Sequence, residues 1–494
     1  MRSGLSTEAP AALPRLRSYV GGTWRDGGEA VPDTNPSHPR EKVAEAFFAQ
    51  PAVALEAVHA AAAAQLAWRA TPAPARGEIL RCAADLLDQR SAAIARDLTR
   101  EEGKTLAESI GETKRAIGIL RYYAAQTLEP DGETYASHSP ATFLYARREP
   151  LGVVVAITPW NFPIAIPAVK IAPALAYGNT VVWKPAGIVP LTAVHFLMAL
   201  IDAGLPPGVL NLVLGRGSDI GEILTTSPEV DAITFTGSNA TGRAIQLRAI
   251  TAGKRVQMEL GGKNPAVVLA DADLGHAAEQ VARGAFLSAG QKCTATSRVI
   301  VEKWALPEFA ERLVQVARDW KLGDPLDADT KVGPLASRDQ MDKVMGYIKI
   351  ATEHDAQVLA GGDAATGLGD GYFVKPTVLA GVPADSRVAR EEIFGPVAVL
   401  LEAGSFEDSI AMANDTEYGL TASIFTRDLD KALRFARDIR TGVVKVNQET
   451  AGYELHAPSG GMKESGSGSR EYGKAPREFF TEWKTVYMDR PPAG

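Results

Sequence analysis

The sequence predicts an α/β protein built on mostly parallel, doubly wound sheets, with a separate β-ribbon. From residue 151 onward, short apolar runs of strand length alternate with helix-length segments, a spacing typical of strand–helix–strand units in a parallel sheet. A second alternating series begins near residue 266. Between 134 and 148 polar and β-favouring residues alternate, which indicates an exposed ribbon outside both series.

Composition excludes several classes of function. The 494 residues are enough for two or three domains, and the net charge of −7 argues against a nucleic-acid partner. The two cysteines, Cys82 and Cys293, cannot form a disulfide framework. The first dozen residues lack the apolar core of a secretion signal, no apolar run reaches membrane-spanning length, and the histidines and cysteines lack metal-ligand spacing. We therefore expect a metal-free, cytoplasmic protein that binds neither nucleic acid nor membranes.

The first part of the chain is expected to be mainly helical. Residues 1–12 resemble a frayed start, and turn-forming residues suggest a hairpin at 19–24 and a turn at 33–36 rather than a helix. Five successive alanines at 60–64 favour a packed helix over 55–68, because alanine has the highest helix propensity. Two further helices are expected at 76–98 and 106–126.

The two alternating series supply the expected sheets. In the first, strands are expected at 152–157, 180–183, 209–214, 232–235 and 256–260, with helices at 165–175, 190–203, 219–226 and 240–251. In the second, strands are expected at 266–269, 298–301, 397–401, 421–425 and 443–446, with a polar connector at 323–337. The alternating strand at 481–488 has no obvious partner left in the chain. Because an unpaired edge strand invites association with another chain, we expect an oligomer.

Three stretches at expected strand ends are candidates for binding a cofactor. A glycine-rich stretch with Gly217 and Gly221 follows a strand and opens a helix, but it is one residue longer than the dinucleotide fingerprint, and a plain tight turn explains it as well. Further on, Gly237 frees the backbone, and Ser238 precedes a helix start whose unpaired N–H groups suit a pyrophosphate. Lys184 follows a strand at the edge where open parallel sheets bind ligands. It contacts a ribose hydroxyl or a phosphate there, unless it is only a solvated surface charge.

One thiol and one carboxylate suggest covalent chemistry on a carbonyl group. Cys293 lies among small and polar residues, and Glu259 follows an expected strand and precedes a flexible pair of glycines. A nucleophilic cysteine with a nearby general base is the minimum equipment for that chemistry. Taken singly, the two residues are better explained as a buried structural cysteine and an ordinary surface glutamate.

Six ordered motifs together resemble the aldehyde dehydrogenase superfamily, over about residues 18–490. They are Pro159-Trp160-Asn161-Phe162-Pro163, Lys184-Pro185-Ala186, Phe235-Thr236-Gly237-Ser238, Glu259-Leu260-Gly261-Gly262-Lys263, Gly290-Gln291-Lys292-Cys293 and Glu391-Glu392-Ile393-Phe394-Gly395-Pro396. Within the superfamily, residues 291–297 and 456–488 are most similar to the α-ketoglutarate semialdehyde (2,5-dioxopentanoate) dehydrogenases.

The resemblance implies an organisation of three parts. A Rossmann-like cofactor-binding domain would comprise residues 13–130 and 151–261, and a catalytic domain residues 262–462. An oligomerisation flap would combine the ribbon at 131–150 with the strand at 478–490. The expected assembly is a homodimer or a homotetramer.

The resemblance also implies roles for individual residues. Cys293 would be the nucleophile, the Asn161 side chain and the Cys293 backbone N–H would stabilise the oxyanion, and Glu259 would activate the water that hydrolyses the thioester. Without the resemblance, Asn161 is a turn asparagine, and Glu392 and Phe394 are an acidic turn and a core aromatic. The cofactor-binding residues would be Thr158, Trp160, Lys184, Gly187, Gly217, Gly221, Phe235, Gly237, Ser238, Glu392 and Phe394, with Glu392 on the nicotinamide ribose and Phe394 beside the nicotinamide.

Two departures from the family's pattern affect specificity. Members that prefer NAD⁺ often carry a glutamate where this chain has Gly187, so NADP⁺ is expected to be accepted beside NAD⁺, with Lys184 pairing the 2′-phosphate and Arg216 as a second candidate. Ser459 stands where the family commonly has Phe, which would leave the substrate tunnel, lined also by Phe162, wider and more polar.

The function that follows is the irreversible, NAD(P)⁺-dependent oxidation of an aldehyde to a free acid through a cysteine thiohemiacetal and a thioester. The favoured substrate is α-ketoglutarate semialdehyde, which would give 2-oxoglutarate. A bulky aromatic aldehyde or another semialdehyde is an alternative. The presence of Glu259 disfavours a relative that transfers the acyl group to coenzyme A. A non-catalytic binding or structural protein on the same scaffold would be expected to lack one of the three catalytic residues.

Overall fold

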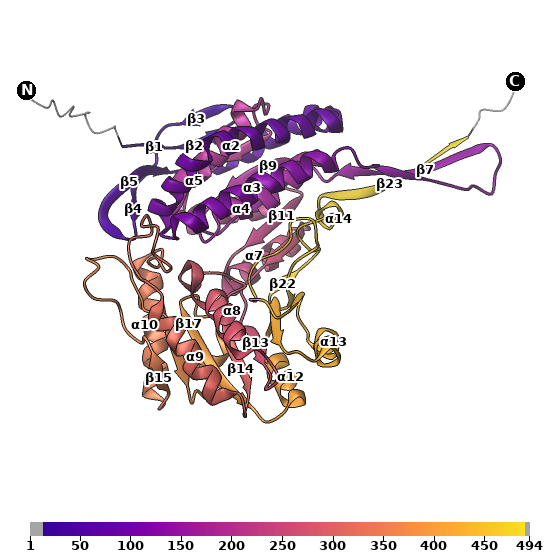
Figure 1. Ribbon diagram of the computed structural model, residues 1–494. Coiled ribbons are helices and arrows are strands. Elements are labelled where there is room, and N and C mark those ends of the chain that lie inside the picture. Colours follow the sequence, from indigo (N-terminus) through magenta and orange to yellow (C-terminus); the bar gives the residue numbers. More distant parts are fainter. Residues whose placement is uncertain (1–12, 490–494) are drawn as a thin grey trace, which may run out of the picture.

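The computed structural model describes residues 13–489 and contains two lobes and a projecting arm (Figure 1). Each lobe is organised around one mostly parallel sheet, and the arm is a separate sheet of three strands. The predicted α/β fold is confirmed. The predicted frayed start at 1–12 lies outside the described residues.

The first sheet has eight strands in the order β22-β12-β11-β8-β9-β10-β2-β3. Its five central strands are parallel and match the first predicted series: β8 (Val153–Ile157), β9 (Thr180–Lys184), β10 (Leu210–Leu212), β11 (Ala232–Thr236) and β12 (Arg255–Glu259). The predicted hairpin is confirmed as β2 (Ser18–Val20) and β3 (Thr23–Arg25), which join one edge antiparallel, and β22 (Gly466–Ser467) joins the other.

Helices cover both faces of this sheet, as the doubly wound prediction requires. They are α1 (Pro51–Ala70), α2 (Ala73–Glu102), α3 (Leu106–Gln126), α4 (Ala165–Ala176), α5 (Pro190–Asp202), α6 (Gly217–Thr226) and α7 (Asn239–Thr251). Val154 and Ala156 of β8 pack in the core with α2–α5, whereas Val153, Val155 and Ile157 pack with α1, α6 and α7.

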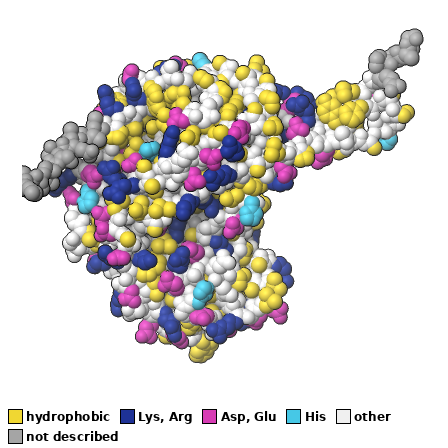
Figure 2. Space-filling view, turned by 45° about the horizontal axis from the view of Figure 1, so that its top comes forward, with side chains coloured by type: hydrophobic (Ala, Val, Ile, Leu, Met, Phe, Trp, Pro, Cys, Tyr) yellow, Lys and Arg dark blue, Asp and Glu magenta, His cyan; other side chains and the backbone are white. Residues whose placement is uncertain are grey.

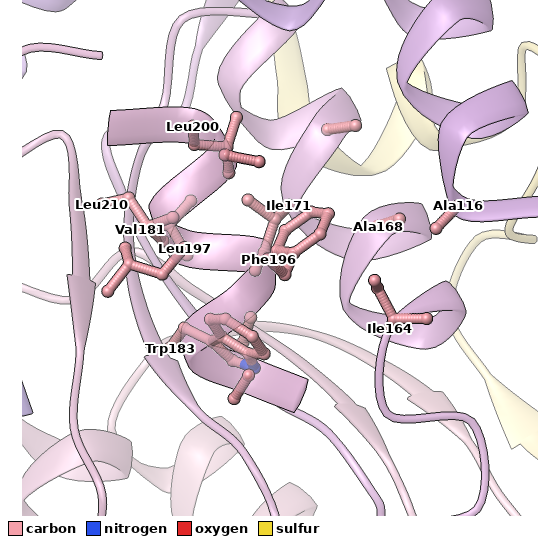
Figure 3. Close-up of a cluster of buried hydrophobic side chains, with 14 of the residues drawn as sticks. Ala116, Ile164, Ala168, Ile171, Val181, Trp183, Phe196, Leu197, Leu200 and Leu210 are labelled. Atoms are coloured by element: carbon pink, nitrogen blue, oxygen red, sulfur yellow. The ribbon is translucent and has the colours of Figure 1, made fainter. Parts of the chain in front are cut away.

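Close packing of helices on the sheet follows from small and aromatic residues. The polyalanine helix is confirmed: Ala57 and Ala61 of α1 are fully buried, and the Thr180 hydroxyl of β9 donates to the Ala61 carbonyl at 2.9 Å. On the opposite face, the rings of Trp183 and Phe196 meet edge to face at 5.7 Å (Figure 3). The strand ends of the first sheet are therefore held in a dense core.

The second sheet has the order β15-β16-β17-β14-β13-β19-β20. The predicted second series is confirmed as β13 (Asn264–Val268), β14 (Thr296–Glu302), β17 (Val397–Ala403), β19 (Thr421–Phe425) and β20 (Val443–Val446), all parallel. The prediction missed β16 (Thr377–Ala380) and the antiparallel β15 (Gln357–Ala360), which are only four residues long. The helices that follow β13 are α8 (Leu274–Phe286), α9 (Leu306–Asp319), α10 (Arg338–Glu353), α11 (Arg387–Arg390), α12 (Phe406–Asn414), α13 (Leu429–Asp438) and α14 (Pro476–Phe480).

The region near the predicted turn at 33–36 contains more strand than expected. A turn is present at residues 36–37, but it joins β4 (Glu29–Asn35) to the long β5 (His38–Phe48), and β1 (Arg15–Leu16) pairs with β5. Charged residues interrupt the apolar pattern of both long strands, which is why they were missed. A further small pair is β18 (Tyr418–Gly419) with β21 (Met462–Lys463).

The arm consists of β6 (Gly132–Tyr135), β7 (Thr142–Pro150) and β23 (Thr481–Asp489), in the order β23-β7-β6. β23 pairs with β7 along its whole length, from Thr481 opposite Pro150 to Asp489 opposite Thr142. The expectation from the local pattern that the last strand has no partner in the chain is therefore wrong. Its partner is the ribbon more than 300 residues earlier, which the family resemblance had grouped with this strand. Residue 490 of the predicted flap lies outside the described range.

Within residues 13–489, no helix is long and apolar enough to cross a membrane. The same residues contain no group of three or more His, Cys, Asp or Glu side chains arranged to hold a metal ion.

Candidate active site

Many of the predicted site residues surround one cavity of about 320 Å³ between the two sheets. Its walls come from the carboxyl ends of β8, β9 and β11 in the first sheet and from residues 293, 340–343 and 392–394 of the second lobe. This is the edge at which open parallel sheets bind ligands. The predicted residues that line it are Thr158, Trp160, Asn161, Lys184, Phe235, Gly237, Ser238, Cys293, Glu392 and Phe394.

The loop that carries Cys293 has an unusual backbone. Ser288, Ala289 and Gly290 have φ angles of +55°, +49° and +69°, and left-handed non-glycine residues are uncommon outside functional sites. A Cβ atom at Gly290 would lie 2.1 Å from the Gly395 carbonyl oxygen. Because of this close contact, the cysteine loop packs directly on the loop that carries Phe394, which itself has a φ of +62°.

The Cys293 thiol is held in its neutral form in this state. Burial raises its pKa to about 12, and the charges of Glu392 and Glu259 add to the shift. The thiolate is the reactive form of cysteine. Attack on a carbonyl carbon therefore requires the thiol proton to leave as the substrate binds.

Asn161 is buried beside the cysteine loop and has a fixed orientation. Its side-chain Nδ2 donates to the backbone carbonyl of Gln291 at 2.9 Å. The backbone carbonyl of Asn161 accepts from Lys104 Nζ at 2.6 Å. A side-chain amide carries two N–H protons, so one remains for another acceptor near Cys293. This position suits an oxyanion donor.

The residues that hold Asn161 were missed by sequence reasoning. Lys104 Nζ lies 2.5 Å from Glu112 Oε2, and Glu112 Oε1 accepts from the N–H groups of Ile164 and Ala165 where α4 begins. Both charged side chains are almost completely buried. Nothing in the local sequence indicated this pairing, because the groups that the two side chains hold, at 161 and 164–165, lie more than 50 residues further along the chain.

Glu259 ends β12, but it does not line the cavity. Its Oε2 accepts from the Gly461 N–H at 3.3 Å, so the carboxyl group faces the loop at 460–461. Burial raises its pKa well above the usual value, and the nearby charge of Glu471 adds to the shift. Glu471 is itself paired with the buried Lys170 at 2.6 Å. A carboxyl group with a raised pKa is suited to general-base work.

The two glycines after Glu259 provide space rather than flexibility. A Cβ atom at Gly261 would lie 2.6 Å from Glu392 Oε2, and one at Gly262 would lie 2.6 Å from the Cys293 carbonyl oxygen. The Gly262 N–H donates to Glu392 Oε1 at 2.9 Å. The pair therefore fixes Glu392 at the wall of the cavity, beside the cysteine.

At the other end of the cavity, the predicted glycines play different parts. A Cβ atom at Gly237 would lie 2.5 Å from the ring of Phe235, so this glycine makes room for a buried aromatic ring rather than freeing the backbone. Ser238 caps α7, and its side chain accepts from Thr241 N–H. Gly217 begins α6 beside Lys184, whereas Gly221 has no close neighbour and does not line the cavity.

Lys184 is buried without a counter-charge. Its Nζ donates only to the Pro185 carbonyl at 3.2 Å, and none of the described carboxylates lies within 4 Å of it. Burial lowers its pKa to about 8. Unpaired buried cations are costly, so this ammonium group is available for an anionic ligand.

The position of the missing glutamate, Gly187, is closed by an aromatic ring. A Cβ atom there would lie 2.8 Å from the edge of Phe48. The guanidinium of Arg216 lies over the same ring at 5.4 Å and forms two bonds to the carboxylate of Glu29. Arg216, the second candidate for binding a 2′-phosphate, is thus already paired with Glu29, which the sequence analysis did not identify.

The remaining predicted residues lie at the edges of the site. Phe394 meets Trp160 edge to face at 5.5 Å. Phe162 lies under Lys104 Nζ at 4.3 Å. The backbone of Ser459 pairs with Glu471. Neither Phe162 nor Ser459 lines the described cavity, and their part in a substrate tunnel stays a prediction.

The model of the aldehyde dehydrogenase family matches residues 24–486. The chain belongs to this family. The enzyme is 44% identical over 475 residues to an alpha-ketoglutaric semialdehyde dehydrogenase of Bacillus subtilis, with 95% of this chain and 97% of that protein covered. A betaine aldehyde dehydrogenase of Staphylococcus aureus in complex with NAD⁺ has a TM-score of 0.94 at 34% identity, covering 97% and 95% of the two chains. An E. coli structure described as an NADP dependent enzyme has a TM-score of 0.92 at 37% identity, covering 96% and 98%. The activity is therefore the NAD(P)-dependent oxidation of an aldehyde to its acid.

Proposed function

We propose that the enzyme oxidises α-ketoglutarate semialdehyde to 2-oxoglutarate. The substrate assignment rests on the similarity to the Bacillus subtilis enzyme over almost the whole of both chains. The geometry supports the chemistry, because a buried cysteine and an oriented amide meet at the wall of one cavity.

In this proposal, Cys293 Sγ attacks the aldehyde carbon, and the free N–H of Asn161 with the backbone N–H of Cys293 donates to the oxyanion of the thiohemiacetal. Such preorganised donors are worth about 10²–10³ in rate each. The cavity residues fit a dinucleotide: the first turn of α7 points its N–H groups towards anions, Lys184 lacks a counter-charge, and Thr236 Oγ1 is buried without a partner among the described residues. When bound, the nicotinamide supplies the hydride acceptor.

Glu259 then takes a proton from the water that hydrolyses the Cys293 thioester. Burial and the nearby charge of Glu471 raise its pKa well above the usual value, which supports a group that can hold and release a proton. Hydrolysis gives a free acid rather than an acyl-coenzyme A. Addition of coenzyme A should therefore neither accelerate turnover nor appear in the product.

The finer cofactor proposal is that NADP⁺ is accepted and preferred. It is supported by the unpaired Lys184 and by the absence of a carboxylate at Gly187. The ratio of kcat/KM for the two cofactors tests it: comparable values would weaken the preference, and strict use of NAD⁺ would end it.

We also propose the three-part division predicted from the sequence and an assembly of two or four copies through the arm. Exposed apolar side chains support the second point, and Figure 2 shows hydrophobic side chains on the projecting arm. Those on its three strands are Tyr135, Phe143, Trp483, Tyr487 and Met488. A monomer in light scattering would contradict the assembly.

The experiment that tests the main proposal is reduced-cofactor formation with a panel of aldehydes. The panel contains α-ketoglutarate semialdehyde, succinate semialdehyde, benzaldehyde and a short aliphatic aldehyde, with Cys293→Ala as the control. Selectivity for the keto-acid semialdehyde supports the proposal. Preference for benzaldehyde would favour a widened tunnel at Ser459, and inactivity with every pair would contradict an enzymatic role.

A further inference from the structure

A buried phenol near the catalytic cysteine has an unused hydrogen-bonding group. The Oη atom of Tyr453 is buried and has no hydrogen-bond partner in the described part of the chain. Its ring packs edge to face on Tyr472 at 5.7 Å. A buried polar atom without a partner costs about 1–3 kcal/mol, so its retention points to a partner that arrives with a ligand.

The segment that carries Tyr453 packs against the cysteine loop, because the Thr450 hydroxyl donates to the carbonyl of Thr294, the residue after Cys293, at 2.7 Å. Burial raises the pKa of Tyr453 well above the usual value, and the charges of Cys293 and Glu259 add to the shift. The pKa of Tyr472 is raised to about 12 by burial, with the charges of Glu471 and Cys293 adding. Neither phenol lines the 320 Å³ cavity that holds the cofactor residues. They therefore lie outside that cavity, with Tyr453 on the segment that packs against the cysteine loop.

A cation stands beside this pair of tyrosines. Arg115 of α3 donates from Nη1 to the Tyr453 carbonyl at 2.5 Å, and its guanidinium lies over the Tyr472 ring at 5.1 Å. The side chain is half-buried, and no carboxylate of residues 13–489 lies within 4 Å of it. Burial lowers the pKa of the nearby Lys445. The charge of Arg115 lowers it further, whereas the charges of Glu449 and Glu454 raise it.

Other buried cations near the site already have partners. Lys104 lies 2.5 Å from Glu112, and Lys170 lies 2.6 Å from Glu471. Lys292, the neighbour of Cys293, donates to the Arg283 carbonyl at 3.1 Å and has Glu449 at 3.9 Å. Neither Arg115 nor Lys445 forms a direct ion pair with any described carboxylate, but the Lys445 Nζ donates to the Ala451 carbonyl, whereas the Arg115 guanidinium is in contact with both tyrosines.

We infer that Arg115 binds the distal carboxylate of the substrate and that the Tyr453 hydroxyl donates to its keto oxygen. The inference rests on the proposed function and names the residues that select a keto-acid semialdehyde. Guanidinium groups match carboxylates bidentately, and a buried donor left unpaired discriminates strongly against a substrate that lacks the acceptor. Arg115 and Tyr453 thus divide the recognition of one substrate between its two polar groups.

The test compares three aldehydes of the same chain length: α-ketoglutarate semialdehyde, glutarate semialdehyde, which lacks the keto group, and pentanal, which lacks both polar groups. Arg115→Gln should lower kcat/KM for both acids by about 10- to 100-fold, mainly through KM, and leave pentanal unchanged. Tyr453→Phe should lower kcat/KM for the keto acid alone. Arg121→Gln is the matched control, because Arg121 lies on the same helix and bonds only to the exposed Asp85 and Asp88.

The outcomes separate the inference from the proposed function. If the unmodified enzyme does not prefer the acids over pentanal, the proposed function fails. If it does, and Arg115→Gln leaves the acids unaffected or impairs all three aldehydes equally, the inference is overturned. Should Arg115→Gln misfold, Arg115→Met decides the question: a lost acid preference with unchanged pentanal turnover supports the inference, and a retained acid preference overturns it.

Discussion

The two sides of Cys293 differ in the groups that line them. On the cofactor side, the walls are backbone and small residues: Cβ atoms at Gly261, Gly262 or Gly290 would lie within 2.6 Å of a carboxylate or carbonyl oxygen, and the charge of Lys184 has no partner of opposite sign. On the other side, buried ion pairs such as Lys104 with Glu112 hold the residues that flank the reaction. The charge of Lys184 is left for a ligand, whereas Lys104 and Glu112 neutralise each other inside the protein. Substitutions on the two sides should therefore change different quantities.

The largest effect is expected from Lys104→Met, which leaves Glu112 as an uncompensated buried charge. Breaking such a pair costs about 3–5 kcal/mol, and Asn161 also loses the bond to its carbonyl. The thermal midpoint should fall, and kcat should fall with it. The matched variant, Lys104→Met with Glu112→Gln, keeps an acceptor for the α4 N–H groups without the charge and should recover most of the stability. An unchanged midpoint in the single variant would contradict an internal role for these charges.

Asn161→Ala should separate catalysis from stability on the same side. The side chain supplies one N–H for the oxyanion, so kcat should decrease by about 10²–10³. The thermal midpoint should fall less than in Lys104→Met, since no buried charge loses its partner. KM for NAD⁺ should stay constant, because the cofactor contacts lie elsewhere in the cavity. Steady-state kinetics with the preferred aldehyde measure both quantities, and a decrease of less than tenfold in kcat would remove Asn161 from the oxyanion site.

The same contrast explains how much the sequence could predict. Cys293, Lys184 and Glu392 lie in short motifs next to strands, where local order along the chain decides which groups meet. Lys104, in the loop between α2 and α3, meets Asn161 across more than 50 residues, and Tyr453 meets Arg115 across more than 300. Such contacts depend on how helices pack, which no local pattern records. For the same reason the local pattern left β23 without a partner, and only the family resemblance grouped this strand with the ribbon at 131–150.

Raising the pH should weaken NADP⁺ binding through Lys184. Burial places the pKa of Lys184 at about 8, so its positive charge is present below that pH and is lost above it. KM for NADP⁺ should therefore rise between pH 7 and pH 9, whereas KM for NAD⁺, which lacks the 2′-phosphate, should change less. Lys184→Met should remove the difference between the two profiles. Parallel profiles for both cofactors in the unmodified enzyme would show that Lys184 does not face the phosphate.

The smallest effect, and the sharpest test of the charge left on the cofactor side, is expected from Glu29→Gln. Glu29 is paired with the guanidinium of Arg216. This guanidinium lies over the Phe48 ring, which adjoins Gly187. Removal of the carboxylate frees Arg216 for a 2′-phosphate and removes a negative charge that repels it. The ratio of kcat/KM for NADP⁺ over NAD⁺ should increase by about two- to fivefold, because exposed ion pairs are weak, and the gain should shrink at high salt. Arg25, which bonds to Glu56 on the same edge of the lobe, offers a control in Glu56→Gln. An equal gain in that control would mean that net charge alone, and not release of Arg216, sets the cofactor ratio.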